Sequence, residues 1–465
     1  MSLFGAILTG NEPMRRCILT LGLTLALAGA GPALAEDLLQ IYDLAVLSDP
    51  VLKQSEQKLL ATKEVKPQSL ALLLPNIGVS GSGTYQNVKA YDVQTGLTTR
   101  NMREDFSSGT ATAQLNQTVY NRAQWIGLQK SDDVISQAEA EYKTSEIQLM
   151  ARTAEAYFNV LRAADLVRSS EALMRANERQ LEQSKQRFEV GLVAITDVND
   201  NQAAYDRSRA QVIANKNALD NSWEALRVII GPVSVPLARL GDNLPLAPPE
   251  PNDIEQWTKV ALENNYDIRA ASMAVAAAKK EVEIQRSGHY PTLGLQAGYN
   301  LDRSGSEMFG GYDTDTSYIG LNLSIPIYQG GAVVSRTRQA GHNLGASQEQ
   351  LDQIRRKVNQ AVTDAFRGVL SSISEVEARK AAIVSATSTL ESTQAGLEVG
   401  TRTQVDVLTA QRQLFENEYL YLSARYDYII QGIKLYQATS GLNREAIERA
   451  NTWLNPGDLL TTSTL

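Results

Sequence analysis

Strict alternation between apolar and polar residues constrains the fold of this chain more than any other feature of its sequence. In residues 318–327, the apolar positions of the alternation are Ile319, Leu321, Leu323, Ile325 and Ile327. Residues 293–301 and 110–119 alternate in the same way. A period of two gives each strand one apolar and one polar face. Each run is about 10 residues long, the length that a tilted strand needs to cross a bilayer.

The chain has too few such strands to close a barrel alone. We expect two strands in each half of the chain, whereas the smallest transmembrane barrels have about eight strands. An open sheet edge cannot lie in lipid, because its unpaired backbone groups would find no water to bond. If these strands meet a bilayer, several chains must therefore share one barrel. The joining segments, 88–107 and 303–315, are polar and contain glycine, so we expect exposed loops there.

Long helices are predicted for most of the remaining chain. Residues 122–188 and 331–395 contain no proline, and in the second segment apolar residues recur every three or four positions, near the coiled-coil repeat. A helix of about 65 residues would be about 100 Å long. Each long helix stops at a Val-Gly pair, and the short connections predict antiparallel hairpins with returning helices over 196–230 and 403–439. Further helices, over 37–66 and 254–286, precede the strands.

The sequence also repeats itself. Glu189-Val190-Gly191 recurs as Glu398-Val399-Gly400, and Asp197 recurs as Asp406. We therefore expect two repeats, 36–231 and 254–441, each with the order helix, strand pair, long helix, helix. The segment between them, 232–253, is rich in proline and predicts an extended linker.

Residues 1–35 have the pattern of a secretory signal peptide. Arg15 and Arg16 precede an apolar run, and Ala33-Leu34-Ala35 provides the small residues of a cleavage site. The apolar run is shorter than the roughly 20 residues that a membrane-spanning helix needs. We expect an exported protein whose mature form lacks cysteine, because Cys17 is the only cysteine of the chain.

The composition makes most catalytic functions improbable. The chain has 2 histidines and 1 cysteine, which leaves little material for a metal site or a Cys/His nucleophile. Its net charge of −8 argues against binding to nucleic acid, which requires concentrated Lys and Arg. The sequence contains no nucleophile-elbow, P-loop or zinc-protease motif. We therefore expect no enzyme, no cofactor and no nucleic-acid partner.

Two classes of protein fit these patterns. One is a passive conduit through a membrane, joined to a pump. The other is a soluble periplasmic coiled-coil protein with a structural role and no membrane part. The strands distinguish the two, since apolar faces directed at lipid would make the protein depend on detergent.

Five motifs make the chain resemble the TolC family of outer-membrane efflux and secretion channels, the outer membrane factors. They are RFEVGLVAITDV at 187–198, VGTRTQVDVL at 399–408, PIYQGG at 326–331, AYFNVL at 156–161 and LDN at 219–221. The resemblance extends from Glu36 to about Asn455, with the same duplication and order of elements.

The resemblance implies a mainly α fold with membrane β structure. In the family, a homotrimer forms one 12-stranded outer-membrane β-barrel from four strands per chain, continued by a long periplasmic α-helical barrel. Here the tail, 442–465, is expected to pack at the equatorial region. The partners implied are outer-membrane lipid, a periplasmic adaptor (membrane fusion) protein and an inner-membrane pump of RND, ABC or MFS type. The implied function is export of drugs, small molecules or type I secreted proteins from a Gram-negative cell.

Two acidic residues at the hairpin tips are the first candidates for a functional site. Asp197 and Asp406 lie just inside the two returning helices, and a ring of such carboxylates in a narrow opening would attract cations. Thr403-x-x-Asp406 also has the spacing of a capping box, so a purely structural role is open from spacing alone. The resemblance assigns Asp406 to the family's constriction ring.

The resemblance also assigns a gating network to Thr196, Asp197 and Arg402. The family tyrosine that bonds the gating aspartate falls on Leu397, and the second constriction aspartate falls on Thr409. We therefore expect a closed state with fewer polar links and a weaker block by cations. How the gate compensates for Leu397 and Thr409 is not evident from the sequence.

The turns of the two hairpins are candidate docking sites. Val190-Gly191-Leu192 and Val399-Gly400-Thr401 resemble the tips that adaptor hairpins cap in this family. Simple termination of the helices by glycine explains the same residues. The sequence identifies neither the cargo nor the particular adaptor and pump, nor whether efflux or protein secretion dominates.

Overall fold

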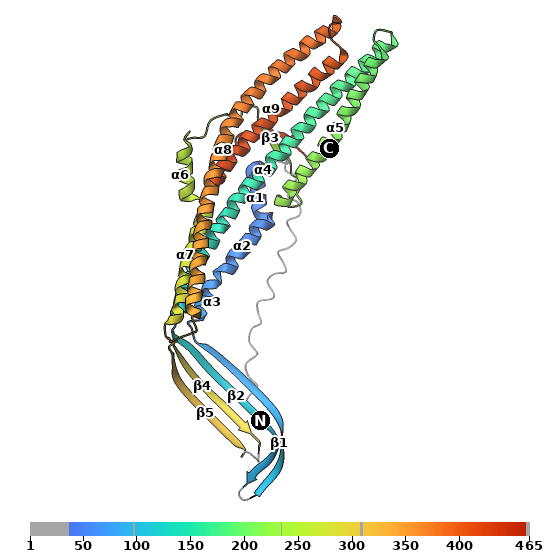
Figure 1. The fold of residues 1–465 in the computed structure, drawn as a ribbon. Coiled ribbons are helices and arrows are strands. Elements are labelled where there is room, and N and C mark those ends of the chain that lie inside the picture. The colour runs from blue at the N-terminus through green and yellow to red at the C-terminus, as the bar shows by residue number, and fades with distance from the viewer. Residues whose placement is uncertain (1–36, 96–97, 234, 307–309, 462–465) are drawn as a thin grey trace, which may run out of the picture.

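The computed structural model describes residues 37–95, 98–233, 235–306 and 310–461. The predicted signal peptide, 1–35, lies outside these residues. The molecule is elongated, with a four-stranded sheet at one end and long helices that run away from it to two hairpin tips at the other (Figure 1).

The sheet consists of β1 (Asn76–Thr95), β2 (Thr98–Tyr120), β4 (Thr292–Ser304) and β5 (Tyr312–Ser324), in the order β1-β2-β4-β5. All three pairings are antiparallel. The alternation predicted for residues 110–119, 293–301 and 318–324 therefore lies on strands. β5 ends at Ser324, short of the predicted run, because Pro326 has no N–H to donate to a neighbouring strand.

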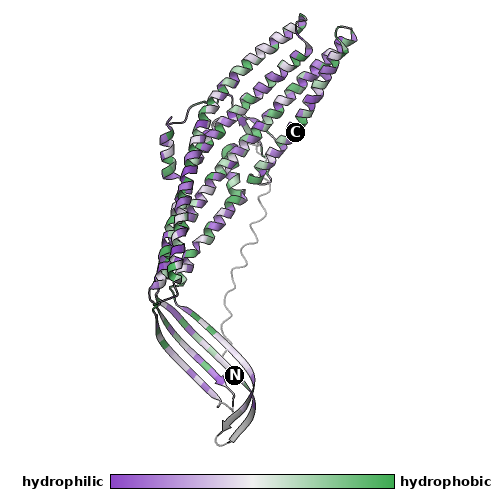
Figure 2. Cartoon of the chain, in the orientation of Figure 1, coloured by the Kyte–Doolittle hydropathy of each residue, from purple (hydrophilic) through white to green (hydrophobic). Residues whose placement is uncertain are grey.

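The register gathers the apolar residues on one face. Ile77 lies opposite Leu115, Leu115 opposite Ala297, and Ala297 opposite Ile319. One residue further along each strand, the row is Gly78, Gln114, Gly298 and Tyr318. Because directly opposite residues point to the same side of a sheet, the first row belongs to an apolar face and the second to a polar one. The mixed hydropathy along the strands is visible in Figure 2.

The loops predicted over 88–107 and 303–315 were largely wrong. β1 continues to Thr95 and β2 begins at Thr98, so the first pair of strands forms one long hairpin. The second pair runs to Ser304 and resumes at Tyr312. The backbone ladder continues through these polar stretches, because hydrogen bonds between strands do not require an apolar face.

Four helices form the two hairpins. The first is made by α4 (Arg122–Glu189) and α5 (Ile195–Ile230), and the second by α8 (Ala332–Glu398) and α9 (Gln404–Ala438). Contacts of α4 with α5, α8 with α9, and α4 with α9 place the hairpins side by side (Figure 1). Within the described ranges, no helix combines the length and apolar character needed to span a membrane.

The helices predicted over 37–66 and 254–286 are both interrupted. The first is divided into α1 (Leu38–Ser48), α2 (Pro50–Lys63) and α3 (Val65–Ala71), and the second into α6 (Ile254–Asn264) and α7 (Tyr266–Arg286). Asp49 accepts a hydrogen bond from Leu52 N at 3.0 Å, and Asn265 accepts one from Asp267 N at 2.8 Å. The breaks at Asp49 and Asn265 are therefore new helix starts with their own side-chain caps, whereas α3 begins after Glu64 without one.

The main core lies about midway along the helices. Tyr157 and Phe158 of α4 are fully buried there, and the Phe158 ring lies 6.2 Å from the Tyr426 ring of α9. The linker contributes β3 (Leu237–Leu240), which pairs antiparallel with β6 (Leu454–Leu460) of the tail, next to α10 (Arg444–Asn451). The linker predicted to be merely extended thus contains a strand, and Tyr157 donates a hydrogen bond to Ala238 O at 2.7 Å.

We predict that Phe158→Ala lowers the free energy of unfolding by about 3–5 kcal/mol, because it leaves a cavity in this core. Urea unfolding followed by far-UV circular dichroism at constant detergent concentration would measure the change. Val228→Ala is the matched control, since Val228 is 74% exposed and should shift stability by less than about 0.5 kcal/mol. Equal unfolding midpoints for the two variants would contradict the placement of the core.

Candidate functional site

Both hairpins turn through the same helix-ending motif. At the first tip, Gly191 and Leu192 donate their N–H groups to carbonyls in the last turn of α4, at 2.9 and 2.8 Å. At the second tip, Gly400 and Thr401 bond the last turn of α8 at 3.1 and 2.8 Å. The glycines have φ of 75° and 79°, a conformation that residues with a Cβ rarely adopt. The glycines therefore determine the shape of both tips.

Apolar side chains project from these turns into solvent. Val190 is 69% exposed, and Leu192 and Val399 are each 74% exposed. Exposed valine and leucine are ordinary when scattered, but here they cluster at the ends of both hairpins. The predicted docking residues therefore form two small apolar surfaces, which we call the tip surfaces (190–192 and 399–401).

Asp406 forms the capping box whose spacing the sequence contains. Its carboxylate accepts hydrogen bonds from Thr403 N and Thr403 Oγ1, each at 2.9 Å, and its own N–H donates to Thr403 Oγ1 at 3.2 Å. The bonds from Thr403 lower the pKa of Asp406, and the charge of Arg402 lowers it further. Asp406 is thus an ionised carboxylate held in a fixed position at the start of α9.

Arg402 packs against the end of α8. A Cβ at position 396 would lie 2.6 Å from Arg402 Cγ, so only a glycine there allows the arginine to fold back along the helix. The sequence interpretation did not single out Gly396. The only sign of its role is that a residue with a Cβ does not fit this close approach of Arg402.

Thr196 and Asp197 lie in the first turn of α5, at the other tip. Among the described residues, no hydrogen bond or ion pair joins Arg402 to either of them. Within one chain, the structure therefore brings Arg402 together with Asp406 but not with Thr196 or Asp197.

Amide side chains connect the two hairpins instead. Gln404 of α9 donates to Asn201 Oδ1 of α5 at 3.1 Å, and Gln411 donates to Asn177 Oδ1 of α4 at 3.3 Å. Asn201, Asn177 and Gln411 are buried. Sequence reasoning missed these links, since nothing local in either helix identifies the partner.

Leu397 and Thr409, singled out in the sequence, carry no acidic group. Leu397 is half-buried in the last turn of α8, and Thr409 Oγ1 donates to Val405 O of its own helix at 2.8 Å. The Leu397 side chain can neither donate nor accept a hydrogen bond, and the Thr409 side chain carries no charge. Of Asp406 and Thr409, which lie three residues apart on α9, only Asp406 is acidic.

The sheet presents a second functional surface at the opposite end of the molecule. Ile319 and Leu321 of β5 are 77% and 70% exposed, and Ile77 and Val79 of β1 are also exposed. β1 and β5 are edge strands, each hydrogen-bonded to one neighbour within the described chain. Arg303 forms ion pairs with Asp315 and Asp313 near the far end of β4 and β5, where the apolar face ends.

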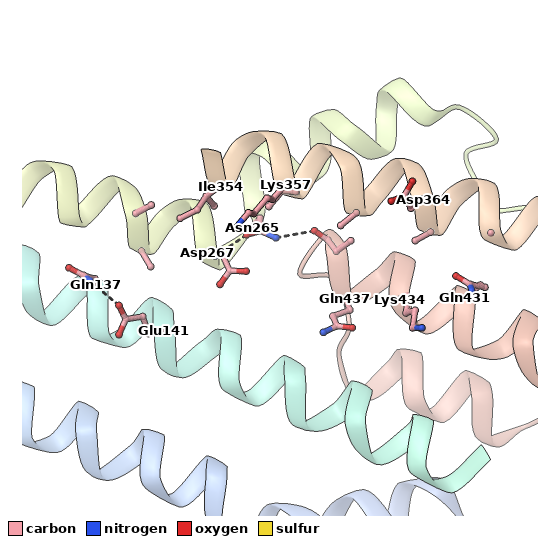
Figure 3. Close-up of a pocket in the computed structure, with 17 residues that line it drawn as sticks. Gln137, Glu141, Asn265, Asp267, Ile354, Lys357, Asp364, Gln431, Lys434 and Gln437 are labelled. Atoms are coloured by element: carbon pink, nitrogen blue, oxygen red, sulfur yellow. Dashed lines mark hydrogen bonds between the residues drawn. The ribbon is translucent and has the colours of Figure 1, made fainter. Parts of the chain in front are cut away.

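A cavity of about 870 Å³ lies between α4, α7, α8 and α9 (Figure 3). Asn265 spans the junction of α7 and α9, donating to Ala438 O at 2.9 Å. Lys357, Asp364 and Lys434 line the cavity with their charged groups exposed. Across the described ranges, no group of three His, Cys, Asp or Glu side chains is placed to hold a metal ion.

A sheet with an exposed apolar face, continued by long helical hairpins, is typical of an outer-membrane conduit. The sequence model described as "Outer membrane efflux protein" matches residues 41–232 and 257–441. The chain belongs to this outer membrane efflux protein family. It is accordingly an outer-membrane channel protein whose helices form the periplasmic part.

Individual relatives agree with the family. The chain is 35% identical to outer membrane protein TolC of Escherichia coli (strain K12), over 90% of this chain and 85% of that protein. It is 28% identical to the alkaline protease secretion protein AprF of Pseudomonas aeruginosa, over 87% of this chain and 84% of that protein. The structure is similar to that of the Campylobacter jejuni CmeC outer membrane channel, with a TM-score of 0.73, 15% identity and 98% of each chain covered.

We predict that Thr403→Val weakens the start of α9 and raises the pKa of Asp406. The variant loses the hydroxyl that both donates to the carboxylate and accepts from its N–H. Because the pKa of Asp406 is lowered in the folded protein, the cap is present above the unfolded pKa and is lost as pH falls through the folded pKa. At neutral pH, hydrogen exchange in the first turn of α9 should accelerate roughly fivefold.

Hydrogen exchange read by mass spectrometry, compared with wild type at each pH, measures this effect. The ratio of rates should shrink at acidic pH, where wild type also loses the carboxylate. Thr409→Val is the control, because Thr409 bonds only its own helix. Equal exchange of Thr403→Val and wild type at neutral pH would contradict the capping role.

Proposed function

We propose that three chains pool their strands to close one 12-stranded barrel in the outer membrane. The observation that carries this proposal is the pair of unpaired edges, β1 and β5, on a sheet with an exposed apolar face. Backbone groups on such edges cannot be left without partners in lipid. Pairing β5 of one chain with β1 of the next removes every edge, and three chains of four strands give an even number within the range of known barrels.

In the same trimer, the helices form a tunnel across the periplasm. Each chain supplies α4 and α8, whose 68 and 67 residues correspond to about 100 Å each. We also propose that the two halves of the chain arose by duplication. The two separate matches of the family model support this origin. The proposal also divides the chain into two repeats, a linker and a tail at the equatorial region, with the repeats at 36–231 and 254–441. The pairing of β3 with β6 fits a tail held at the middle of the tunnel.

The channel serves export, in efflux and in type I secretion. A relative named for protease secretion matches 87% of the chain, and one named as an efflux protein matches 73% of it. A passive tunnel has no energy source, so we propose that an inner-membrane pump of RND, ABC or MFS type drives transport through a periplasmic adaptor. A wide tunnel with small polar side chains would carry diverse cargo.

The gate of the tunnel lies at the tips in this proposal. Three copies of Asp406 would form one ring of ionised carboxylates, since each is held at the start of α9 by Thr403. Arg402 is free of ion pairs within the described chain and would bond Thr196 and Asp197 across the interface between chains. Leu397 and Thr409 add no charge, so one acidic ring attracts cations where the family has two.

We predict that divalent cations block the open channel weakly and that Asp406→Ala abolishes the block. Removing the carboxylates removes the negative potential that concentrates cations in the narrow entrance. Conductance in planar bilayers, with increasing magnesium on the tip side, is the measurement. Glu189→Ala, which removes an exposed carboxylate near the other tip, should keep the block. Strong block that persists in Asp406→Ala would exclude the ring.

We further propose that the tip surfaces are where the adaptor docks. Val190→Asp with Val399→Asp should reduce efflux by at least about tenfold while trimers still assemble, because burying two unpaired carboxylates opposes docking. These changes leave Gly191 and Gly400, and hence the turns, intact. Drug-accumulation assays in cells that lack the native channel measure efflux, and gel filtration in detergent checks assembly. Wild-type efflux in the double variant would remove the docking role.

A further inference from the structure

A groove of about 600 Å³ runs between the two hairpins, in the half of α4 and α5 nearer the tips, and is separate from the sheet. Its walls are α5 and α9, and its floor is α4. Leu166, Leu173, Leu408 and Phe415 line it with half-buried apolar surface. Grooves of this volume, mostly apolar with a few polar groups, are the usual form of small-molecule sites.

Two arginines line the groove at similar distances from the hairpin tips. Arg207 lies six residues beyond Asn201 on α5, and Arg412 lies eight residues beyond Gln404 on α9. Asn201 and Gln404 are hydrogen-bonded to each other, and both helices run away from the tips. At 1.5 Å per residue, the arginines therefore differ in height by about 3 Å.

Neither arginine has an acidic partner in the described part of the chain. Two acids also line the groove, but Asp200 lies about 10 Å toward the tip from Arg207, and Glu416 lies about 6 Å beyond Arg412. Neither acid forms an ion pair with these arginines. The two unpaired guanidinium groups lie at similar distances from the tips, with Asp200 on the tip side and Glu416 on the other side. This arrangement favours a single anionic group between the guanidinium groups.

A buried amide provides a second, independent sign of a ligand. Asn215 lines the same groove, is 5% exposed, and its Nδ2 has no hydrogen-bond partner. Gln211 donates to Asn215 Oδ1 at 2.9 Å, so only the donor side of the amide is unsatisfied. A buried donor without an acceptor costs free energy that a ligand would recover. Asn215 lies eight residues beyond Arg207, or about 12 Å along α5.

We propose that this groove binds an amphipathic organic monoanion. Its carboxylate or sulfonate lies between Arg207 and Arg412, its apolar body covers Leu173 and Phe415, and an acceptor oxygen at its far end accepts from Asn215 Nδ2. The ligand contacts both hairpins, and the side chains of Arg207 and Asn215 reach toward it from positions about 12 Å apart along α5. The proposal goes beyond the channel function and does not depend on the identity of the exported cargo.

The test uses 6-methoxy-2-naphthoate, which has a carboxylate at one end of a flat apolar body and an ether oxygen at the other. Isothermal titration calorimetry with the purified full chain in lipid nanodiscs measures its affinity, with empty nanodiscs subtracted. Wild type should bind the probe at least about tenfold more tightly than 6-methoxy-2-(aminomethyl)naphthalene, a cation with the same body.

Three variants separate the contacts. Arg207→Gln with Arg412→Gln should weaken binding at least about tenfold, whereas Arg209→Gln, an exposed arginine of α5 outside the groove, should not. Asn215→Ala should abolish the preference for the methoxy compound over 2-naphthoate and leave the affinity for 2-naphthoate unchanged. No binding above empty nanodiscs, or equal binding by the double arginine variant, would overturn the proposal.

Discussion

The demand of backbone N–H and C=O groups for partners in lipid governs this structure. The four strands place an apolar face outward, as the row from Ile77 to Ile319 shows, but leave β1 and β5 each with one open edge. A soluble protein would cover such edges with a loop or a helix. Here the helices leave the sheet at one end and cover neither edge (Figure 1). These open edges are the reason for the proposal that other copies of the chain complete the sheet.

The helices meet a different requirement, which is length. A chain that spans a wide periplasmic gap with little protein requires long helices rather than a thick core, and the core is correspondingly concentrated around Tyr157 and Phe158. Toward the tips, the hairpins are joined by amides such as Gln404 and Asn201 rather than by large apolar side chains. Polar links of this kind contribute little net stability per bond. The middle of the molecule is therefore held together more strongly than the tips, which agrees with the proposed gate there.

The sequence predicted the elements whose pattern is local. Alternation placed β2, β4 and β5 and their faces, and the lack of proline placed α4 within one residue of its observed end. The hairpin over 88–107 was missed because its polar residues provide no contrast between a buried and an exposed face. The strands β3 and β6 were missed because they are short and lie far apart in the chain. Gly396 and the amide links were missed because they depend on contacts between helices. At the tips, the capping box of Asp406 was predictable from spacing, whereas the ring proposed for it requires contacts between chains.

Light scattering coupled to gel filtration, on the mature protein with and without detergent, tests the shared barrel most directly. The account predicts particles that contain three chains in detergent and loss of solubility once detergent is removed. Single, dispersed chains in plain buffer would contradict it, because an apolar face and two open edges would then be stable in water.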